Sequence, residues 1–186
     1  MDTVVAAPPA SVPVTLRKLY FLRFAFAAVW AALLSTADAL GPLSTTLLLV
    51  YPLFDVAAAV VDVRSARADG GPVTLLYANI AISSLTVLAL ALAATSGIPA
   101  VLRVWGAWAV TAGIVQLVAG AVRRHLGGQW PMIVSGGIST LAGLSFVTQA
   151  GADDPSLGSL AGYAFLGGVF FLVSALRLGR GARRPA

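Results

Sequence analysis

The stretch Tyr51-Pro52-Leu53-Phe54-Asp55 lies inside an apolar run, residues 43–63, that is long enough to cross a lipid bilayer. About 20 apolar residues at 1.5 Å per residue span a hydrocarbon core of about 30 Å. Asp55 is therefore predicted near the middle of a membrane, where a carboxylate costs roughly 3 kcal/mol on insertion scales. Such a group is expected to face the interior of a helix bundle. There it either forms part of a functional site or is an inert acid, protonated or paired with an arginine.

The composition is that of an integral membrane protein. Of 186 residues, 59% are hydrophobic and 10% are charged, and the mean hydropathy is +0.91, far outside the range of soluble domains. The sequence has no cysteine and a single histidine, His125, which excludes disulfides and argues against a metal site. No cofactor is indicated. The net charge of +5 comes from basic residues at segment ends, where anionic lipid attracts them, so nucleic acid is not an expected partner.

Six apolar runs follow one another along the chain, separated by Gly, Pro or charged residues. They are residues 19–37, 43–63, 73–95, 99–122, 130–149 and 157–176. Each is long enough for a transmembrane helix. We therefore predict an all-α integral membrane protein with six transmembrane helices, arranged as three helical hairpins. The second helix of each hairpin repeats a loose pattern of an aromatic residue, a small or polar pair and an arginine at its end. The predicted domains are an N-terminal tail (1–18), a transmembrane domain (19–177) and a basic C-terminal tail (178–186).

The N-terminal region allows two readings. Pro8, Pro9 and Pro13 predict a tail without helix up to Thr15. Alternatively, residues 19–37 are a secretory signal, because the sequence Ala-Asp-Ala at 37–39 resembles a small-residue cleavage site. The long polar lead-in and the interruption by Arg23 argue against a signal, and we leave its cleavage open.

Basic residues at the segment ends predict the orientation. One side of the predicted bundle receives nearly all of them, whereas the opposite turns carry only the nearby Arg103 and acidic residues. Lys and Arg in short loops stay in the cytoplasm, so both chain ends are predicted to be cytoplasmic. This describes a multi-pass protein of the cell inner (plasma) membrane with lipid as a partner. The basic residues on that side are Arg17, Lys18, Arg64, Arg67, Arg123, Arg124, Arg177, Arg180, Arg183 and Arg184.

Polar side chains inside the runs fall mainly in the cytoplasmic half. Polar groups in hydrocarbon face protein or water, so this asymmetry predicts a polar pocket open to the cytoplasm and closed to the outside. The alternative is that they only join helices, since such hydrogen bonds average about 0.6 kcal/mol and are common. The candidate site consists of Asp55, Asp62, Arg23, Asn79, Gln116, Tyr51 and Pro52.

Charge pairing and helix contacts can also be anticipated. Asp55 and Asp62 are seven residues apart and share one helix face. Arg23 lies about one turn into the first run, which predicts an ion pair with Asp62 and leaves Asp55 without a counter-charge. Pro52 is expected to bend the helix beside Asp55. The small residues Gly158 and Gly162 predict a close contact between helices of the bundle.

Most of the chain from the second to the sixth apolar run resembles a known family. The segment Trp-Ala-Val-Thr-Ala-Gly-Ile-Val-Gln at 108–116, the pair Arg123-Arg124, and the glycine-rich residues 130–143 with Gly136-Gly137 are similar to the HdeD-like family. These are small bacterial membrane proteins of six helices and short repeats. The resemblance implies the fold and a role in acid resistance, but no catalytic residues.

Two functions follow as expectations. The first is a non-enzymatic inner-membrane protein of the HdeD-like type, acting in tolerance of acid or another envelope stress. The second is a small transporter or proton-coupled channel with Asp55 at the base of the pocket, since proton relays use intramembrane acids. An enzyme is poorly supported, because convergent titratable groups are few. The small-molecule or ion ligand and any homo-oligomer stay open.

Overall fold

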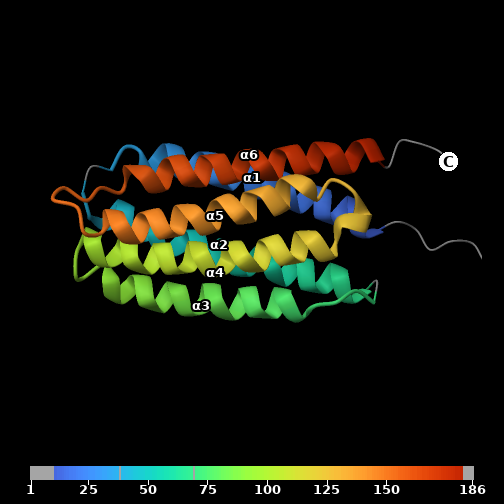
Figure 1. Ribbon diagram of the computed structural model, residues 1–186, viewed down its shortest axis with the longest axis horizontal. Helices are drawn as coiled ribbons and strands as arrows, with labels where there is room; N and C mark the ends of the chain where they lie inside the picture. The colour runs from blue at the N-terminus through green and yellow to red at the C-terminus, as the bar shows by residue number, and fades with distance from the viewer. Residues whose placement is uncertain (1–10, 38, 69, 182–186) are drawn as a thin grey trace, which may run out of the picture.

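The computed structural model describes residues 11–37, 39–68 and 70–181, and these form a bundle of long α-helices joined by short turns (Figure 1). No strand occurs in these ranges. The prediction of an all-helical protein is confirmed. The elements are α1 (Ser11–Leu34), α2 (Pro42–Ala68), α3 (Thr74–Ala93), α4 (Ile98–Val122), a 3-10 turn η1 (Arg124–Leu126), α5 (Trp130–Gln149) and α6 (Gly158–Gly181).

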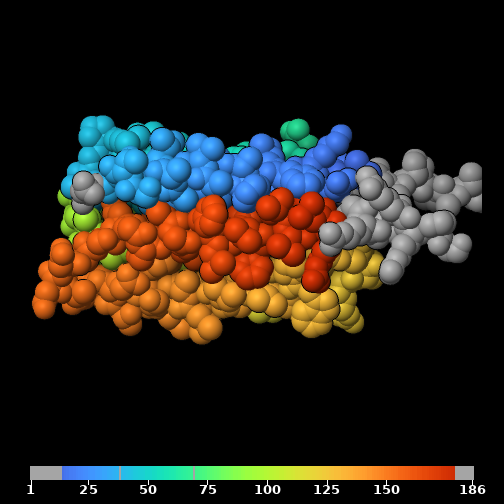
Figure 2. All heavy atoms as spheres, turned by 90° about the horizontal axis from the view of Figure 1, so that it is seen from above, coloured from blue at the N-terminus to red at the C-terminus, as the bar shows by residue number. Residues whose placement is uncertain are grey.

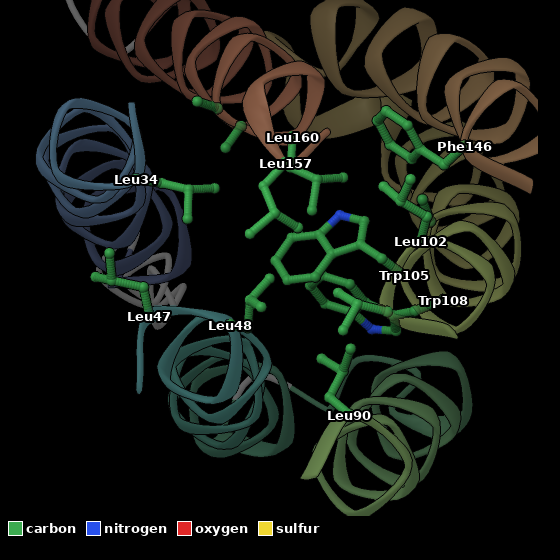
Figure 3. Packing of buried hydrophobic residues seen from close by; sticks show 14 of the residues in the cluster. Leu34, Leu47, Leu48, Leu90, Leu102, Trp105, Trp108, Phe146, Leu157 and Leu160 are labelled. Carbon is green, nitrogen blue, oxygen red and sulfur yellow. The ribbon is translucent and has the colours of Figure 1, made fainter. Parts of the chain in front are cut away.

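The helices form a closed ring. Each packs against the helix that precedes and the helix that follows it in sequence, and α6 closes the ring against α1. Figure 3 shows this ring end-on with side chains filling its axis, and Figure 2 shows α6 lying between α1 and α5 on one face. The contacts α4–α5 and α1–α6 are the most extensive, and α1–α2 and α5–α6 the least. The ring therefore consists of two tighter groups joined by two weaker seams. One group is the α1–α6 pair, and the other, which we call the α2–α5 group, consists of the four helices from α2 to α5.

The length and apolar composition of most of the helices suit a membrane-spanning bundle. The five helices α2 to α6 are long and apolar enough to cross a bilayer. Helix α1 also has 24 residues, but it carries Arg17, Lys18 and Arg23 within seven residues and is not among these five. The structure thus supports a multi-pass membrane protein.

The largest differences from the predicted boundaries lie at three helix ends. Helix α1 begins at Ser11 and includes Pro13 in its first turn, where a helix needs no backbone N–H donor. Helix α2 runs to Ala68 through a segment rich in charge, and Arg67 lies in its last turn, where a cation is stabilised by the helix dipole. Helix α6 continues to Gly181, into the predicted basic tail. The rest of the two predicted tails, 1–10 and 182–186, lies outside the described residues.

The most extensive helix contact, between α4 and α5, is built around glycines. A Cβ added to Gly113 would lie 2.8 Å from the Gly136 carbonyl oxygen, and one added to Gly143 would lie 2.5 Å from the Gly106 carbonyl oxygen. Small residues let transmembrane helices approach this closely. By contrast, a Cβ on Gly162 would meet nothing within 4 Å, so the prediction that the Gly158/Gly162 motif packs inside the bundle is wrong. Its face points outward.

One half of the ring is filled by a buried apolar cluster, and we call it the apolar half. Trp105 lies on the axis of the bundle and is fully buried. Its side chain stacks on that of Trp30, with 5.4 Å between the centroids of the two aromatic rings. Leucines from five helices and Phe146 surround it (Figure 3). This half contains the turns α1–α2, α3–α4 and α5–α6. The other half, which contains the start of α1 and the end of α6, is the polar half.

Candidate functional site: a polar cavity in one half of the ring

The centre of the polar half is the carboxylate of Asp55 on α2. Arg23 on α1 donates from Nη1 to Asp55 Oδ1 at 2.7 Å. On α3, Asn79 Nδ2 and Ser83 Oγ donate to Asp55 Oδ2 at 2.6 and 2.8 Å. Trp108 on α4 donates from Nε1 to Ser83 Oγ at 3.0 Å. This network joins four consecutive helices and provides the charge and hydrogen-bond partners that a buried carboxylate requires.

A second ion pair lies nearer the end of the bundle. Arg123, directly after α4, donates from Nη1 to Asp62 Oδ2 on α2 at 2.7 Å. The side chains of both pairs are only 12–16% exposed. The two pairs bring two positive and two negative charges into the polar half, so their charges cancel.

A cavity of about 140 Å³ lies beside both ion pairs. Its wall carries apolar side chains from α1, α4, α5 and α6 as well as the charged groups. It extends from the aromatic layer near the middle of the bundle to Gln129 and Arg123 at the end of the polar half. A space of this size lined by polar groups can hold water or a small ligand group.

An aromatic layer separates the cavity from the apolar half. Tyr51 and Trp108 line the cavity and meet edge to face at 5.8 Å. Both also contact Trp105, at 5.6 and 5.2 Å, and Trp105 belongs to the buried cluster that fills the axis. The cavity is therefore closed toward the apolar half.

Polar contacts also cross the two weaker seams. Arg23 and Asp55 bridge α1 and α2. The hydroxyls of Ser139 on α5 and Tyr163 on α6 form a hydrogen bond across the other seam, and both residues line the cavity. The two seams of the ring are thus each held by a polar contact on the cavity wall.

The structure brings together most of the residues predicted from the sequence. Six of them line the cavity: Asp55, Asp62, Arg23, Asn79, Gln116 and Tyr51. Gln116 donates to the carbonyl oxygen of Met132 at 3.2 Å, a bond between helices that fits the alternative of simple helix joining. Pro52 is buried inside α2 and does not line the cavity.

The predicted partner of Arg23 is wrong. Arg23 pairs with Asp55, and Asp62 pairs with Arg123. The prediction placed Arg23 one turn into its helix, but α1 begins at Ser11, so Arg23 lies about three turns in. This depth matches Asp55 rather than Asp62, and the expectation that Asp55 has no counter-charge fails for the same reason.

Sequence reasoning did not assign several members of the site. Arg123 was read as a loop cation, although its place at the end of a helix puts it level with Asp62 near the end of α2. Ser83 and Ser139 are polar residues inside apolar runs, and nothing in the sequence indicates which groups they contact. Trp108 and Tyr163 carried no signal beyond aromatic character, because their partners lie on other helices.

Among the described residues, no group of three or more His, Cys, Asp or Glu could hold a metal ion. No protein-family model matches the chain, nor does any curated protein or any solved structure. The HdeD-like resemblance stays a prediction, and the glycines that carry it, Gly113, Gly136 and Gly143, lie at the α4–α5 contact.

Proposed function

We propose that this chain is a small proton-coupled transporter of the cell inner membrane, with the cavity as its binding site and Asp55 as its proton-accepting group. The observation that carries the proposal is the cavity itself, which contains two Arg–Asp pairs and is shut toward the apolar half. Ionisable groups inside a membrane domain mark substrate and proton pathways. A site reached from one side at a time is what alternating access requires.

The proposed orientation puts the polar half toward the cytoplasm. Basic residues described at that end include Arg64, Arg67, Arg123 and Arg177, and Lys and Arg are retained on the cytoplasmic side. In this proposal α1 is the sixth span, because it completes the ring. Its Arg23 is neutralised by Asp55 rather than exposed to lipid. Both chain ends are then cytoplasmic.

The two seams suggest how protonation would be coupled to movement. The Arg23–Asp55 pair joins the α1–α6 pair to the α2–α5 group. Protonation of Asp55 removes one of the two charges and weakens this link. The α1–α6 pair could then shift against the rest of the ring. Hinged or rocking motion of two groups of helices is the usual route to alternating access.

Proton flux into proteoliposomes tests the proposal. Purified protein is reconstituted with a pH-sensitive dye inside the vesicles, and the outside is acidified. We expect wild-type protein to acidify the vesicles faster than empty vesicles do, and Asp55→Asn to lower that rate by about a hundredfold or more, the scale of effect expected for losing a proton-transfer group. Asp62→Asn, which alters the ion pair nearer the end of the bundle, should keep most of the rate.

A folding defect must be separated from a loss of flux. Asp55→Asn leaves the Arg23 charge unpaired, and this destabilises the bundle. The double variant Arg23→Gln/Asp55→Asn removes both charges and should fold while still failing to carry protons. Equal rates for wild-type protein and empty vesicles, or an unchanged rate in Asp55→Asn, would contradict proton-coupled transport.

Tolerance of acid or envelope stress is a second candidate, favoured by the HdeD-like pattern of Gly113, Gly136 and Gly143. These residues bring the backbones of α4 and α5 close together. The pattern therefore supports a helix packing that this chain would share with HdeD-like proteins. Proton-linked transport and acid tolerance are compatible. Growth at low pH of cells that express wild-type protein or Asp55→Asn tests the link. Equal growth of the two would separate acid tolerance from the site.

A further inference from the structure

The cavity reaches the outer edge of the α5–α6 seam. This seam has the least contact of the six in the ring. The cavity wall includes Ile138 on α5 and Leu166 and Gly167 on α6. Leu166 is 44% exposed, so it faces both the cavity and the outer surface of the bundle, which in a membrane is lipid. The cavity therefore borders lipid along this seam.

Gly167 keeps this border open. A Cβ added to Gly167 would meet nothing within 4 Å, which shows space on its side of the helix. Gly162, on the same helix, has equally free space, but it does not line the cavity. The first glycine therefore leaves room between the cavity and lipid, and the second only leaves room on the outer surface.

The charges of the cavity indicate the kind of head group it accepts. Arg23 and Arg123 are each paired with a carboxylate, so the charges of the two pairs cancel. A ligand with net charge would bring an unpaired charge beside ion pairs that are largely buried, which is costly. Paired charges can instead bind a polar group without net charge through local dipoles. Ser139 Oγ donates to the Ala109 carbonyl oxygen and shares a hydrogen bond with the Tyr163 hydroxyl, so the free lone pairs of these two oxygens can accept hydrogen bonds from such a group.

We propose that the cavity binds a single-chain amphiphile without net charge, with its polar head beside the two ion pairs and its chain leaving between α5 and α6 into the membrane. This inference rests on the proposed function only in that the same cavity is the binding site. It names the substrate class and the route of entry. The aromatic layer at the closed end sets how deep the head can reach.

Photolabelling in nanodiscs tests the proposal. The probe is lysophosphatidylcholine with a diazirine on its chain close to the head group. Adducts are located by peptide mass spectrometry. We expect labelling of Ser135, Ser139 or Tyr163, which line the cavity, and of these Ser135 and Ser139 are buried. Gly167→Trp should lower these adducts by about tenfold, equivalent to about 1.4 kcal/mol of occupancy. The matched control Gly162→Trp should leave them unchanged.

Further variants make each outcome decisive. Ile138→Trp narrows the same seam from α5 and should cause a similar loss, which covers the case in which Gly167→Trp does not fold. Lysophosphatidylglycerol, an anionic probe with the same chain, should label these residues several-fold less. Equal labelling by the two probes would overturn the head-group assignment. Labelling that is unchanged by both tryptophans, reduced equally by Gly162→Trp, or confined to outward-facing residues would overturn entry through the seam.

The readout also separates this inference from the proposed function. Proton flux that depends on Asp55, together with absent cavity adducts, would leave a transporter whose ligand enters from the polar end, and the inference would fail alone. Cavity adducts that depend on Gly167, together with no proton flux, would leave an amphiphile-binding membrane protein. Proton-coupled transport would then be wrong.

Discussion

The two halves of the ring are built from the same six helices but are held together in different ways. The apolar half is a packed cluster around Trp105 with leucines and aromatic rings from several helices (Figure 3). The polar half contains a cavity of about 140 Å³ and two ion pairs that link α1, α2 and the end of α4. The boundary between them is the aromatic layer of Tyr51 and Trp108.

This difference shows which half can respond to a proton or a ligand. Packing between apolar side chains in a membrane depends on shape and dispersion, which neither a proton nor a small ligand changes. An Arg–Asp pair depends on charge, so protonation or a competing ligand group changes it directly. The apolar half is thus suited to hold the ring closed, and the polar half to change.

The contrast between the two halves would not hold if the ion pairs contributed nothing to the stability of the ring. We expect Asp55→Asn to lower the free energy of unfolding by about 3 kcal/mol, because it leaves the buried Arg23 without its counter-charge. Asp62→Asn should lower it less, by about 1 to 2 kcal/mol, because Asp62 has one hydrogen-bond donor, whereas Asp55 has three. Unfolding in mixed micelles with increasing SDS measures both values.

The double variant Arg23→Gln/Asp55→Asn is the control for this prediction. Removing both charges avoids an unpaired buried ion, so we expect it to be more stable than Asp55→Asn alone. If the double variant is as unstable as the sum of its single variants, the two side chains do not interact. The polar half would then be held by packing, as the apolar half is.

Much of the fold could be predicted because hydrophobic length is a strong signal. The fifth run, 130–149, coincides with α5, and the fourth differs from α4 by one residue. The ends of α1, α2 and α6 could not be predicted as well. Arginine and alanine continue a helix beyond the hydrocarbon core, so an apolar run ends before its helix does.

The location of the candidate site could be predicted from the sequence, but its ion pairs and hydrogen bonds could not. The depth of polar residues in the predicted helices places Asp55, Asn79 and Gln116 in one half, because hydrocarbon restricts where polar groups occur. The pairing of Arg23 depended on the start of α1, and the role of Trp108 depended on which helices are neighbours in the ring. Neither feature is a local property of the sequence.

The two halves can also be compared in how closely the backbones of α4 and α5 approach each other. Gly136 faces Gly113 beside the cavity, and Gly143 faces Gly106 toward the apolar half. In both places an added Cβ would lie within 2.6 Å of a backbone oxygen. We expect Gly136→Ala and Gly143→Ala to lower the free energy of unfolding by similar amounts, about 1 to 3 kcal/mol. The same SDS titration measures them.

Gly137 provides the matched control for the glycine contact. It adjoins Gly136 on α5, but its added Cβ would come no closer than 3.9 Å to Leu117. Gly137→Ala should be neutral or slightly stabilising, since alanine favours helix by up to about 1 kcal/mol over glycine. A large cost in only one of Gly136→Ala and Gly143→Ala would show that the α4–α5 spacing itself differs between the halves.

The smallest expected effect concerns the two tryptophans stacked in the apolar half. Trp30 donates from Nε1 to the carbonyl oxygen of Leu47 at 2.7 Å, whereas the buried Nε1 of Trp105 has no partner among the described residues. Both changes to phenylalanine remove similar volume from the same cluster. Trp30→Phe also removes a hydrogen bond, and Trp105→Phe removes an unsatisfied donor. We therefore expect Trp105→Phe to be less destabilising by about 1 kcal/mol, measured by SDS titration. Equal losses would mean that the Trp105 donor finds a partner once the bundle is in the membrane. The apolar half would then contain a polar contact as well, and the contrast between the halves would weaken.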